Sequence, residues 1–130
     1  MPEFSKRSRE NLSSCHPDLQ QLFNTVVKYY DCSIICGFRG KAAQAEAFQK
    51  GFSKARYPFS AHNTHLSTAV DVAPFIIDWE DIERFRHFAG FVKLAARVLK
   101  IDVGWGGDFT VNGKPWFDGA HWELIITDKE

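Results

Sequence analysis

The stretch SAHNTHLSTAVD, residues 60–71, organises the fold that the sequence predicts. Residues 67–75 alternate small and β-branched side chains and are interrupted at Pro74, which is typical of a β-strand. On such a strand Asp71 points to the face opposite its two sequence neighbours. His62 lies in the loop that leads into this strand. The stretch therefore places an imidazole and a carboxylate beside an apolar strand.

A second stretch, DGAHWEL at residues 118–124, offers matching side chains. Residues 120–127 are expected to form a strand on which His121 and Glu123 share one face. Imidazole nitrogens and carboxylate oxygens are ligands that zinc takes, and three protein ligands leave a coordination position open for a catalytic water. The candidate ligands are His62, Asp71 and His121.

A small zinc hydrolase also needs a general base and a cationic group near the substrate. Asp118 stands three residues before His121 and is the candidate base, whereas Glu123 is better placed to orient a ligand imidazole. Arg39 follows an apolar strand predicted at 32–38 and precedes a helix N-terminus, where exposed amide donors and a cation favour a carboxylate. Alternatively, Arg39 is a surface arginine paired with a neighbouring acid.

The remaining segments show ordinary helix and turn signals. Apolar side chains at helical spacing predict a first helix from Pro17 to Tyr30 and a longer one that begins at Asp78, the expected N-cap, and ends near Lys100. An Ala-, Gln- and Glu-rich segment predicts a further helix over 41–50. The other expected elements are a loop at 52–63, a short strand at 101–103, a glycine-rich turn at 104–109 and a loop or hairpin around Asn112-Gly113.

The composition limits the possible classes of protein. The 130 residues fit one domain, and the 16 basic and 16 acidic side chains cancel, so no net field attracts nucleic acid or an anionic membrane. Three cysteines are too few for a disulfide framework and suit a reducing cytosol. The N-terminus lacks the apolar segment of a signal peptide, and no apolar run approaches the roughly 20 residues of a membrane span.

Ordered motifs along the chain carry a resemblance to a known family. The patterns SxHN followed by AVDV, then WGGDF, then DxxHWEL resemble the zinc D-alanyl-D-alanine and L-alanyl-D-glutamate peptidases. The likeness is closest to bacteriophage endolysins that cut peptidoglycan peptide stems, and it extends from Phe4 to Leu124 through HPDLQQL, CGFRGKAAQ and APFIIDWED. Several motifs in a fixed order are a specific signal.

The resemblance implies a fold and a set of roles. The fold is α+β, with a small antiparallel sheet that carries the zinc and packs against helices, as in hedgehog and D,D-peptidase domains. By matching position, the zinc ligands are His62, Asp71 and His121, and Asp118 is the catalytic base. Arg39 binds substrate and stabilises the transition state, and Ser60 lies in the substrate site.

One departure from the family pattern leaves a ligand open. In SxHxxGxAxD the aspartate follows the histidine by seven positions, whereas Asp71 follows His62 by nine and His65 by six. Ser60, two residues before His62, and Asn63, directly after it, favour His62. His65 is then a loop residue near the site.

We therefore expect a zinc peptidase that hydrolyses the L-Ala-D-Glu or a related bond of wall peptide stems. It is expected to be a monomer that is made in the cytoplasm without a signal peptide and acts on the bacterial wall after release. The alternatives are a D-alanyl-D-alanine carboxypeptidase or dipeptidase, and a non-catalytic wall-binding module on the same fold. Candidates for lining the groove are Trp105, Trp116 and Trp122, with core packing expected for at least one of them.

Overall fold

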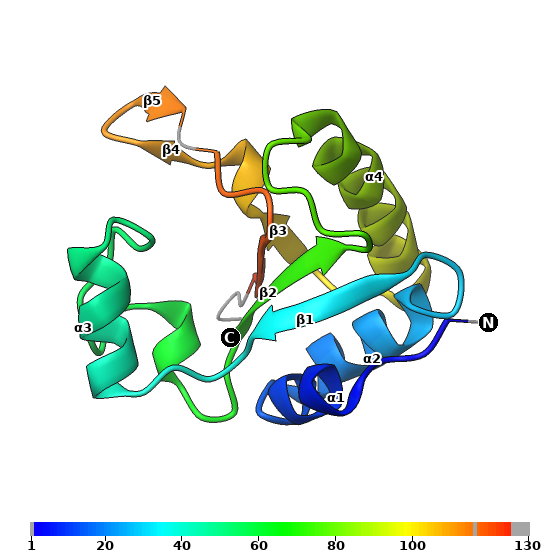
Figure 1. The fold of residues 1–130 in the computed structure, drawn as a ribbon, viewed down its shortest axis with the longest axis horizontal. Helices are drawn as coiled ribbons and strands as arrows, with labels where there is room; N and C mark the ends of the chain where they lie inside the picture. The colour runs from blue at the N-terminus through cyan, green and yellow to red at the C-terminus, as the bar shows by residue number, and fades with distance from the viewer. Residues whose placement is uncertain (1, 116, 126–130) are drawn as a thin grey trace, which may run out of the picture.

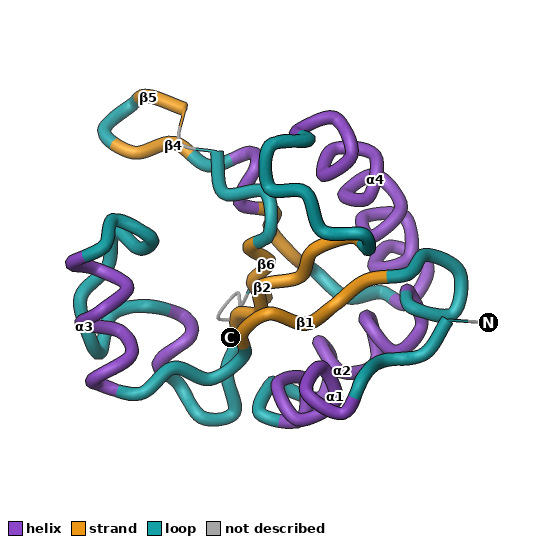
Figure 2. Tube along the Cα trace, viewed as in Figure 1, coloured by secondary structure: helices purple, strands orange, loops and turns teal. Residues whose placement is uncertain are grey.

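The computed structural model describes residues 2–115 and 117–125 and has the expected α+β architecture. Its main sheet is antiparallel, with strand order β1-β2-β6-β3. Figure 2 shows β1, β2 and β6 side by side. The strand that carries Asp71 is therefore an inner strand with a neighbour on each side. The strands are β1 (Cys32–Cys36), β2 (Ala69–Pro74), β6 (His121–Leu124) and β3 (Val103–Trp105).

Three of the helices pack with the sheet, and one stands apart. In Figure 1, α1, α2 and α4 gather beside the strands, and α2 contacts α4 while α1 contacts β1. The fourth helix, α3, lies beyond the end of β1, away from the other three. The end of the sheet at which β1 finishes is therefore flanked by α3 rather than by α1, α2 and α4. The helices are α1 (Lys6–Ser13), α2 (Pro17–Val26), α3 (Lys41–Gln49) and α4 (Ile82–Leu99).

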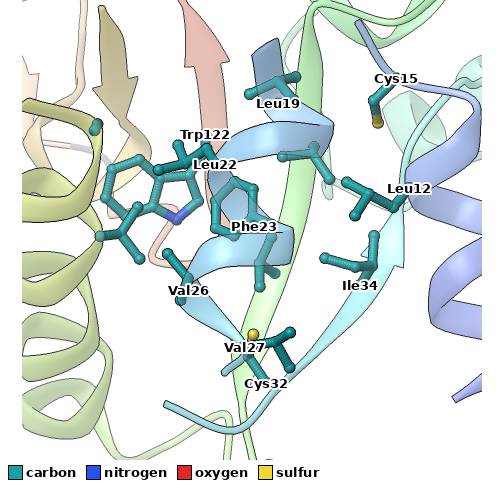
Figure 3. Packing of buried hydrophobic residues seen from close by; sticks show 14 of the residues in the cluster. Leu12, Cys15, Leu19, Leu22, Phe23, Val26, Val27, Cys32, Ile34 and Trp122 are labelled. Atoms are coloured by element: carbon teal, nitrogen blue, oxygen red, sulfur yellow. The ribbon is translucent and has the colours of Figure 1, made fainter. Parts of the chain in front are cut away.

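The hydrophobic core lies between helices α1, α2 and α4 and one face of the sheet. Val70, Val72 and Trp122 are fully buried there, and Trp122 packs edge-on against Phe23 of α2 with ring centroids 6.3 Å apart (Figure 3). Burying each such side chain stabilises the fold by about 1.5–3 kcal/mol. The alternation predicted for β2 is confirmed, since these valines enter the core and Asp71 between them points to the opposite face.

Helix α1 was not expected from the sequence. It begins after Ser5, whose hydroxyl accepts a hydrogen bond from the Ser8 amide at 3.2 Å. Only Ser8 and Leu12 of this helix are buried, so its sequence lacks the apolar stripe that reveals an amphipathic helix. Its packing against β1 is therefore stabilised partly by polar contacts, including the hydrogen bond from the Ile34 amide to the Ser8 hydroxyl at 3.0 Å.

Two helix boundaries differ from those expected. The N-cap of α4 is Asp81, which accepts from the Arg84 amide at 3.1 Å, and the expectation of Asp78 in this role was wrong. Asp78 instead accepts from the Glu80 amide at 3.0 Å in a turn before the helix, so an acid suited to capping occurs at both positions. Helix α2 ends at Val26, four residues before the expected Tyr30, because the chain turns there towards β1.

A short hairpin projects from the sheet after the 3-10 helix η2 (Gly106–Asp108). Its strands are β4 (Thr110–Val111) and β5 (Lys114–Pro115), joined by the predicted Asn112-Gly113 turn. Both turn residues have positive φ, 54° and 76°, as a two-residue type I′ connection requires. No helix in residues 2–115 and 117–125 has the length and apolar character needed to span a bilayer.

Candidate metal centre

Sheet register brings two of the candidate ligands together. Strand β2 pairs with β6 so that Asp71 lies directly opposite His121. On the other side of β2, the register of β1 shifts after Ile34, and Cys36 lies opposite Asp71. Residues opposite each other on antiparallel strands have neighbouring side chains on the same face. Asp71 therefore has one candidate partner on each adjacent strand.

The third candidate, His62, comes from the short 3-10 helix η1 (Ala61–Asn63). Ser60 caps this turn, since its hydroxyl accepts from the His62 amide at 3.2 Å and its own amide donates to Asn63 Oδ1 at 3.0 Å. The ring of His62 is almost fully buried, at 1% exposure, and its Nδ1 lies 2.8 Å from the Gly37 carbonyl oxygen. A capped turn and this hydrogen bond fix the ring so that Nε2 faces the sheet.

The three side chains converge on one point. His62 Nε2 lies 3.2 Å from His121 Nδ1, and each of these nitrogens lies 3.3 Å from Asp71 Oδ1. Ligand bonds of about 2.0–2.1 Å in a tetrahedron place neighbouring ligand atoms roughly 3.3–3.4 Å apart. The spacing therefore fits three ligands of one tetrahedral metal ion, with the fourth position open.

The hydrogen bonds around the three side chains also fit a metal ion between them. Asp71 Oδ1 is buried and has no hydrogen-bond donor among the described residues. His62 Nδ1 is bonded to the Gly37 carbonyl, and His121 Nε2 lies 2.7 Å from Glu123 Oε1. In each ring the outer nitrogen thus has a hydrogen-bond partner, and the other nitrogen faces the centre, where the two inner nitrogens lie 3.2 Å apart. Such outer hydrogen bonds fix the tautomer of metal-binding histidines, the role that Glu123 was expected to have.

The charges in the cluster favour a positive charge at its centre. Burial by itself lowers the pKa of His62, but the close contacts of its ring with Asp71 and Cys36 and the charge of Asp71 raise it to about 10. Burial likewise lowers the pKa of His121, and Asp71 and Glu123 raise it to about 9. Burial raises the pKa of Asp71, but both imidazoles together hold it well below its usual range. The site is therefore built to surround positive charge.

Two other residues compete for a ligand role. Cys36, His62 and Asp71 offer ligand atoms that all lie within 4.8 Å of one another. The atoms of His62, Asp71 and His121 are joined by distances of 3.2–3.3 Å, so Cys36 and His121 are both candidates for the third ligand beside His62 and Asp71. His65 is exposed, packs its ring against Phe38 at 5.4 Å, and is outside both groupings.

Asp118 lies beside this trio in the loop before β6. Its amide donates to the Gly106 carbonyl at 3.1 Å, and its carbonyl accepts from the His121 amide at 3.1 Å, so backbone contacts link it to the ligand strand. A methyl group at Gly106 would lie 2.2 Å from the Asp118 carbonyl oxygen, so only glycine permits this approach. Burial, then the charge of Asp71, raises the pKa of Asp118, which favours proton uptake there.

Arg39 is held in position by the buried side-chain amide of Gln44, a role that was not predicted from the sequence. Gln44 of α3 is fully buried, and its Oε1 accepts from Arg39 Nε at 2.8 Å and from Asn63 Nδ2 at 3.2 Å. Its Nε2 donates to Ser53 Oγ at 2.9 Å and to the Ala55 carbonyl at 2.7 Å. Gln44 thereby joins α3, the loop after it and η1. Gln44 lies in the helix predicted at 41–50, but the sequence has no pattern that indicates its contact with Arg39.

The candidate ligands, Asp118 and Arg39 line one pocket of about 540 Å³. Arg39 reaches it with a guanidinium nitrogen 3.4 Å from Ser60 Oγ, so the predicted substrate-binding residues lie next to each other. Trp105 and Trp122 are buried in the core and do not line this pocket, and Trp116 lies outside the described residues. The pocket therefore combines the metal trio, an acid with a raised pKa and a guanidinium. Its members include Arg39, Ser60, His62, Asp71, Asp118 and His121.

Comparison with known proteins gives consistent matches over nearly the whole chain. The model of the phage L-alanyl-D-glutamate peptidase family matches residues 2–125. The L-alanyl-D-glutamate peptidase of Escherichia phage T5 is 29% identical over 136 residues, which cover 95% of this chain and 98% of the relative. The crystal structure of the Serratia marcescens L-Ala D-Glu endopeptidase ChiX is similar, with a TM-score of 0.76, 31% sequence identity, and coverage of 95% of this chain and 90% of that chain.

Proposed function

Since the chain belongs to the phage L-alanyl-D-glutamate peptidase family, we propose that it hydrolyses the L-Ala–D-Glu bond of peptidoglycan peptide stems with a zinc ion held by His62, Asp71 and His121. The observation that carries the metal assignment is the 3.2–3.3 Å spacing of the three ligand atoms. Two imidazoles and a carboxylate are a zinc donor set. A zinc ion bound there supplies a Lewis acid and lowers the pKa of a water to about 7.

Asp118 is the proposed general base. It lies in the same pocket as the ligands, and its raised pKa suits a group that must accept a proton and release it within one reaction cycle. Asp118 takes the proton of the attacking water and then gives it to the nitrogen of the leaving D-Glu. The hydrogen bond between its carbonyl and the His121 amide keeps the base in register with the ligand strand.

Arg39 and Ser60 are the proposed substrate-binding pair. The guanidinium is oriented by Gln44 and lies beside the Ser60 hydroxyl, so it presents charged donors to the pocket. Such donors stabilise the negative charge that develops on the carbonyl oxygen of the scissile amide, or bind a substrate carboxylate. Because Gln44 is buried, the guanidinium is held in position before substrate arrives.

The family and both relatives are described as L-alanyl-D-glutamate peptidases, which favours the endopeptidase over the D-alanyl-D-alanine carboxypeptidase and over a non-catalytic wall-binding module. Product analysis of digested peptidoglycan tests the choice. We expect new N-termini on D-Glu, loss of activity on chelation and recovery with zinc. Free D-Ala would identify the carboxypeptidase, and release of no product by zinc-loaded protein would identify the binding module.

The variant Asp118→Asn tests the proposed base. We expect kcat to fall about 10²–10⁴-fold, the usual contribution of general acid–base catalysis, while the protein still binds zinc. Asp108→Asn is the matched control, because Asp108 is an exposed acid paired with Lys93 at 2.8 Å and lies outside the metal pocket. Retention of at least half of wild-type kcat by Asp118→Asn would remove Asp118 from the mechanism.

A further inference from the structure

A second hollow of about 670 Å³ adjoins the metal pocket. The two share Arg39, Phe52, Asp71 and Asp118 in their walls. They therefore form one groove, with the proposed ligand Asp71 and the proposed base Asp118 at the border between its halves. A substrate whose scissile bond lies at the metal has room to extend in both directions.

The walls of the second hollow are mainly apolar away from the shared residues. Ile35 of β1, Trp79 before α4 and Phe117 before β6 line it, and they are 38%, 58% and 37% exposed. Trp79 stacks on Phe85, with ring centroids 5.6 Å apart and planes 22° apart, and Phe85 is buried. The Trp79 indole is thus supported on one face while much of its surface is open to a ligand. Exposed aromatic side chains gathered in a hollow are typical of a binding surface.

The two halves of the groove differ in chemistry. The metal pocket adds the cation Lys54, the hydroxyls of Ser53, Ser60 and Thr64, and Glu123, whose carboxylate lies 2.7 Å from His121 Nε2. The second hollow adds no charged side chain to the shared residues. A glutamate whose nitrogen lies in the scissile amide has two carboxyls, and only one of them extends the peptide, so its side of the bond carries negative charge. The alanyl side carries no charge, because its nitrogen is acylated by the lactyl ether of muramic acid.

We propose that the apolar hollow binds the muramoyl side of the substrate, and that Trp79 packs against the N-acetylmuramic acid ring. The inference rests on the proposed function, and it adds that the enzyme distinguishes stems attached to glycan from free peptides. An amphipathic sugar ring presents C–H groups on one face, and a supported indole offers a broad apolar surface to them. The charged D-Glu side then occupies the half of the groove that contains Lys54, with Arg39 at the border between the halves.

The test compares two soluble substrates with the same peptide, one N-acylated by an N-acetylmuramoyl lactyl group and the other by an acetyl group. The measured quantity is the ratio of their kcat/KM values on zinc-loaded enzyme. We expect wild-type enzyme to prefer the muramoyl substrate about tenfold, and Trp79→Ala to bring the ratio near one. Trp79→Phe, which keeps an aromatic face, is expected to give an intermediate ratio. Tyr29→Ala is the matched control, since Tyr29 is 71% exposed and lines neither hollow.

The outcomes separate this inference from the proposed function. Cleavage of the acetyl substrate by wild-type enzyme supports the proposed function whatever the ratio is. A wild-type ratio near one, or a ratio unchanged by Trp79→Ala, would overturn the muramoyl site. An equal loss on both substrates in Trp79→Ala and Trp79→Phe would also overturn it, because Trp79 would then support the active site in general. If wild-type enzyme cleaves neither substrate, the proposed function fails. In that case binding of the muramoyl compound to wild-type protein is measured by calorimetry, and absence of binding would overturn the inference as well.

Discussion

Gly106→Ala should disable the site without touching a ligand. The added methyl carbon would lie 2.2 Å from the Asp118 carbonyl oxygen and 2.9 Å from His121 Cβ, whereas ordinary contacts are 3.4–4 Å. Relieving the first contact requires the Asp118 backbone to move by 3.4 minus 2.2, about 1.2 Å. A displacement of about 1 Å at a catalytic group costs roughly 10²-fold in rate. We therefore expect kcat/KM on an L-Ala-D-Glu peptide to fall about 100-fold.

Gly104→Ala is the matched control, because it adds the same methyl group nearby in β3. The nearest atom to that carbon is Ile125 Cγ1 at 3.9 Å, an ordinary contact, so kcat/KM should stay within about twofold of wild type. Both variants are assayed with zinc in excess and well below their unfolding temperatures, so that loss of fold does not enter the comparison. If Gly106→Ala retains more than half of wild-type kcat/KM, the claim that Gly106 positions Asp118 and His121 is refuted.

Two further variables address the guanidinium and the metal. Gln44→Leu removes four hydrogen bonds at nearly constant side-chain volume. We expect the free energy of unfolding, measured with denaturant, to fall by about 2–4 kcal/mol. We also expect kcat to fall at least tenfold while the zinc content stays at one per chain. Retained kcat would show that Arg39 does not depend on this amide. The pKa values of about 10 for His62 and about 9 for His121 mean that metal must displace protons, so zinc affinity should rise about 10–100-fold per pH unit between pH 6 and 8, measured by competition with a chelator. A zinc affinity that does not change with pH would contradict the raised pKa values of His62 and His121.

The parts of the site that lie on strands could be predicted from the sequence. Alternation alone placed Asp71 opposite the valines of β2 and put His121 and Glu123 on one face of β6, and the sheet register has both features. Those inferences succeed because a strand has a period of two and one face is buried here. The Asn112-Gly113 turn was predictable for a similar local reason, since its backbone requires positive φ.

The parts that depend on loop geometry could not be predicted. Spacing left His62 and His65 both possible, and the three-dimensional course of the loop, with Ser60 capping η1, separates them. Gln44 was hidden for a different reason. Helix α3 buries only Gln44 and Ala47, so it has no apolar stripe to show which face turns inward.

A helix capped by Asp78, as the sequence predicted, would contain Trp79 in its first turn. The helix is instead capped by Asp81, so Trp79 precedes it and lines the groove. Choosing between Asp78 and Asp81 as the cap decides the direction of this side chain. Both aspartates are followed by acids and apolar residues, so local propensity does not separate them. The later start of α4 thus places the Trp79 side chain in the proposed substrate groove and not within the helix.

The proposed function requires one catalytic zinc ion held by His62, Asp71 and His121. An anomalous difference map, measured at the zinc absorption edge from crystals grown with zinc, tests it most directly. We expect a single strong peak about 2.0–2.2 Å from His62 Nε2, His121 Nδ1 and Asp71 Oδ1. A peak bonded to Cys36 or His65 in place of His121 or His62, or no peak between the three side chains, would contradict the account.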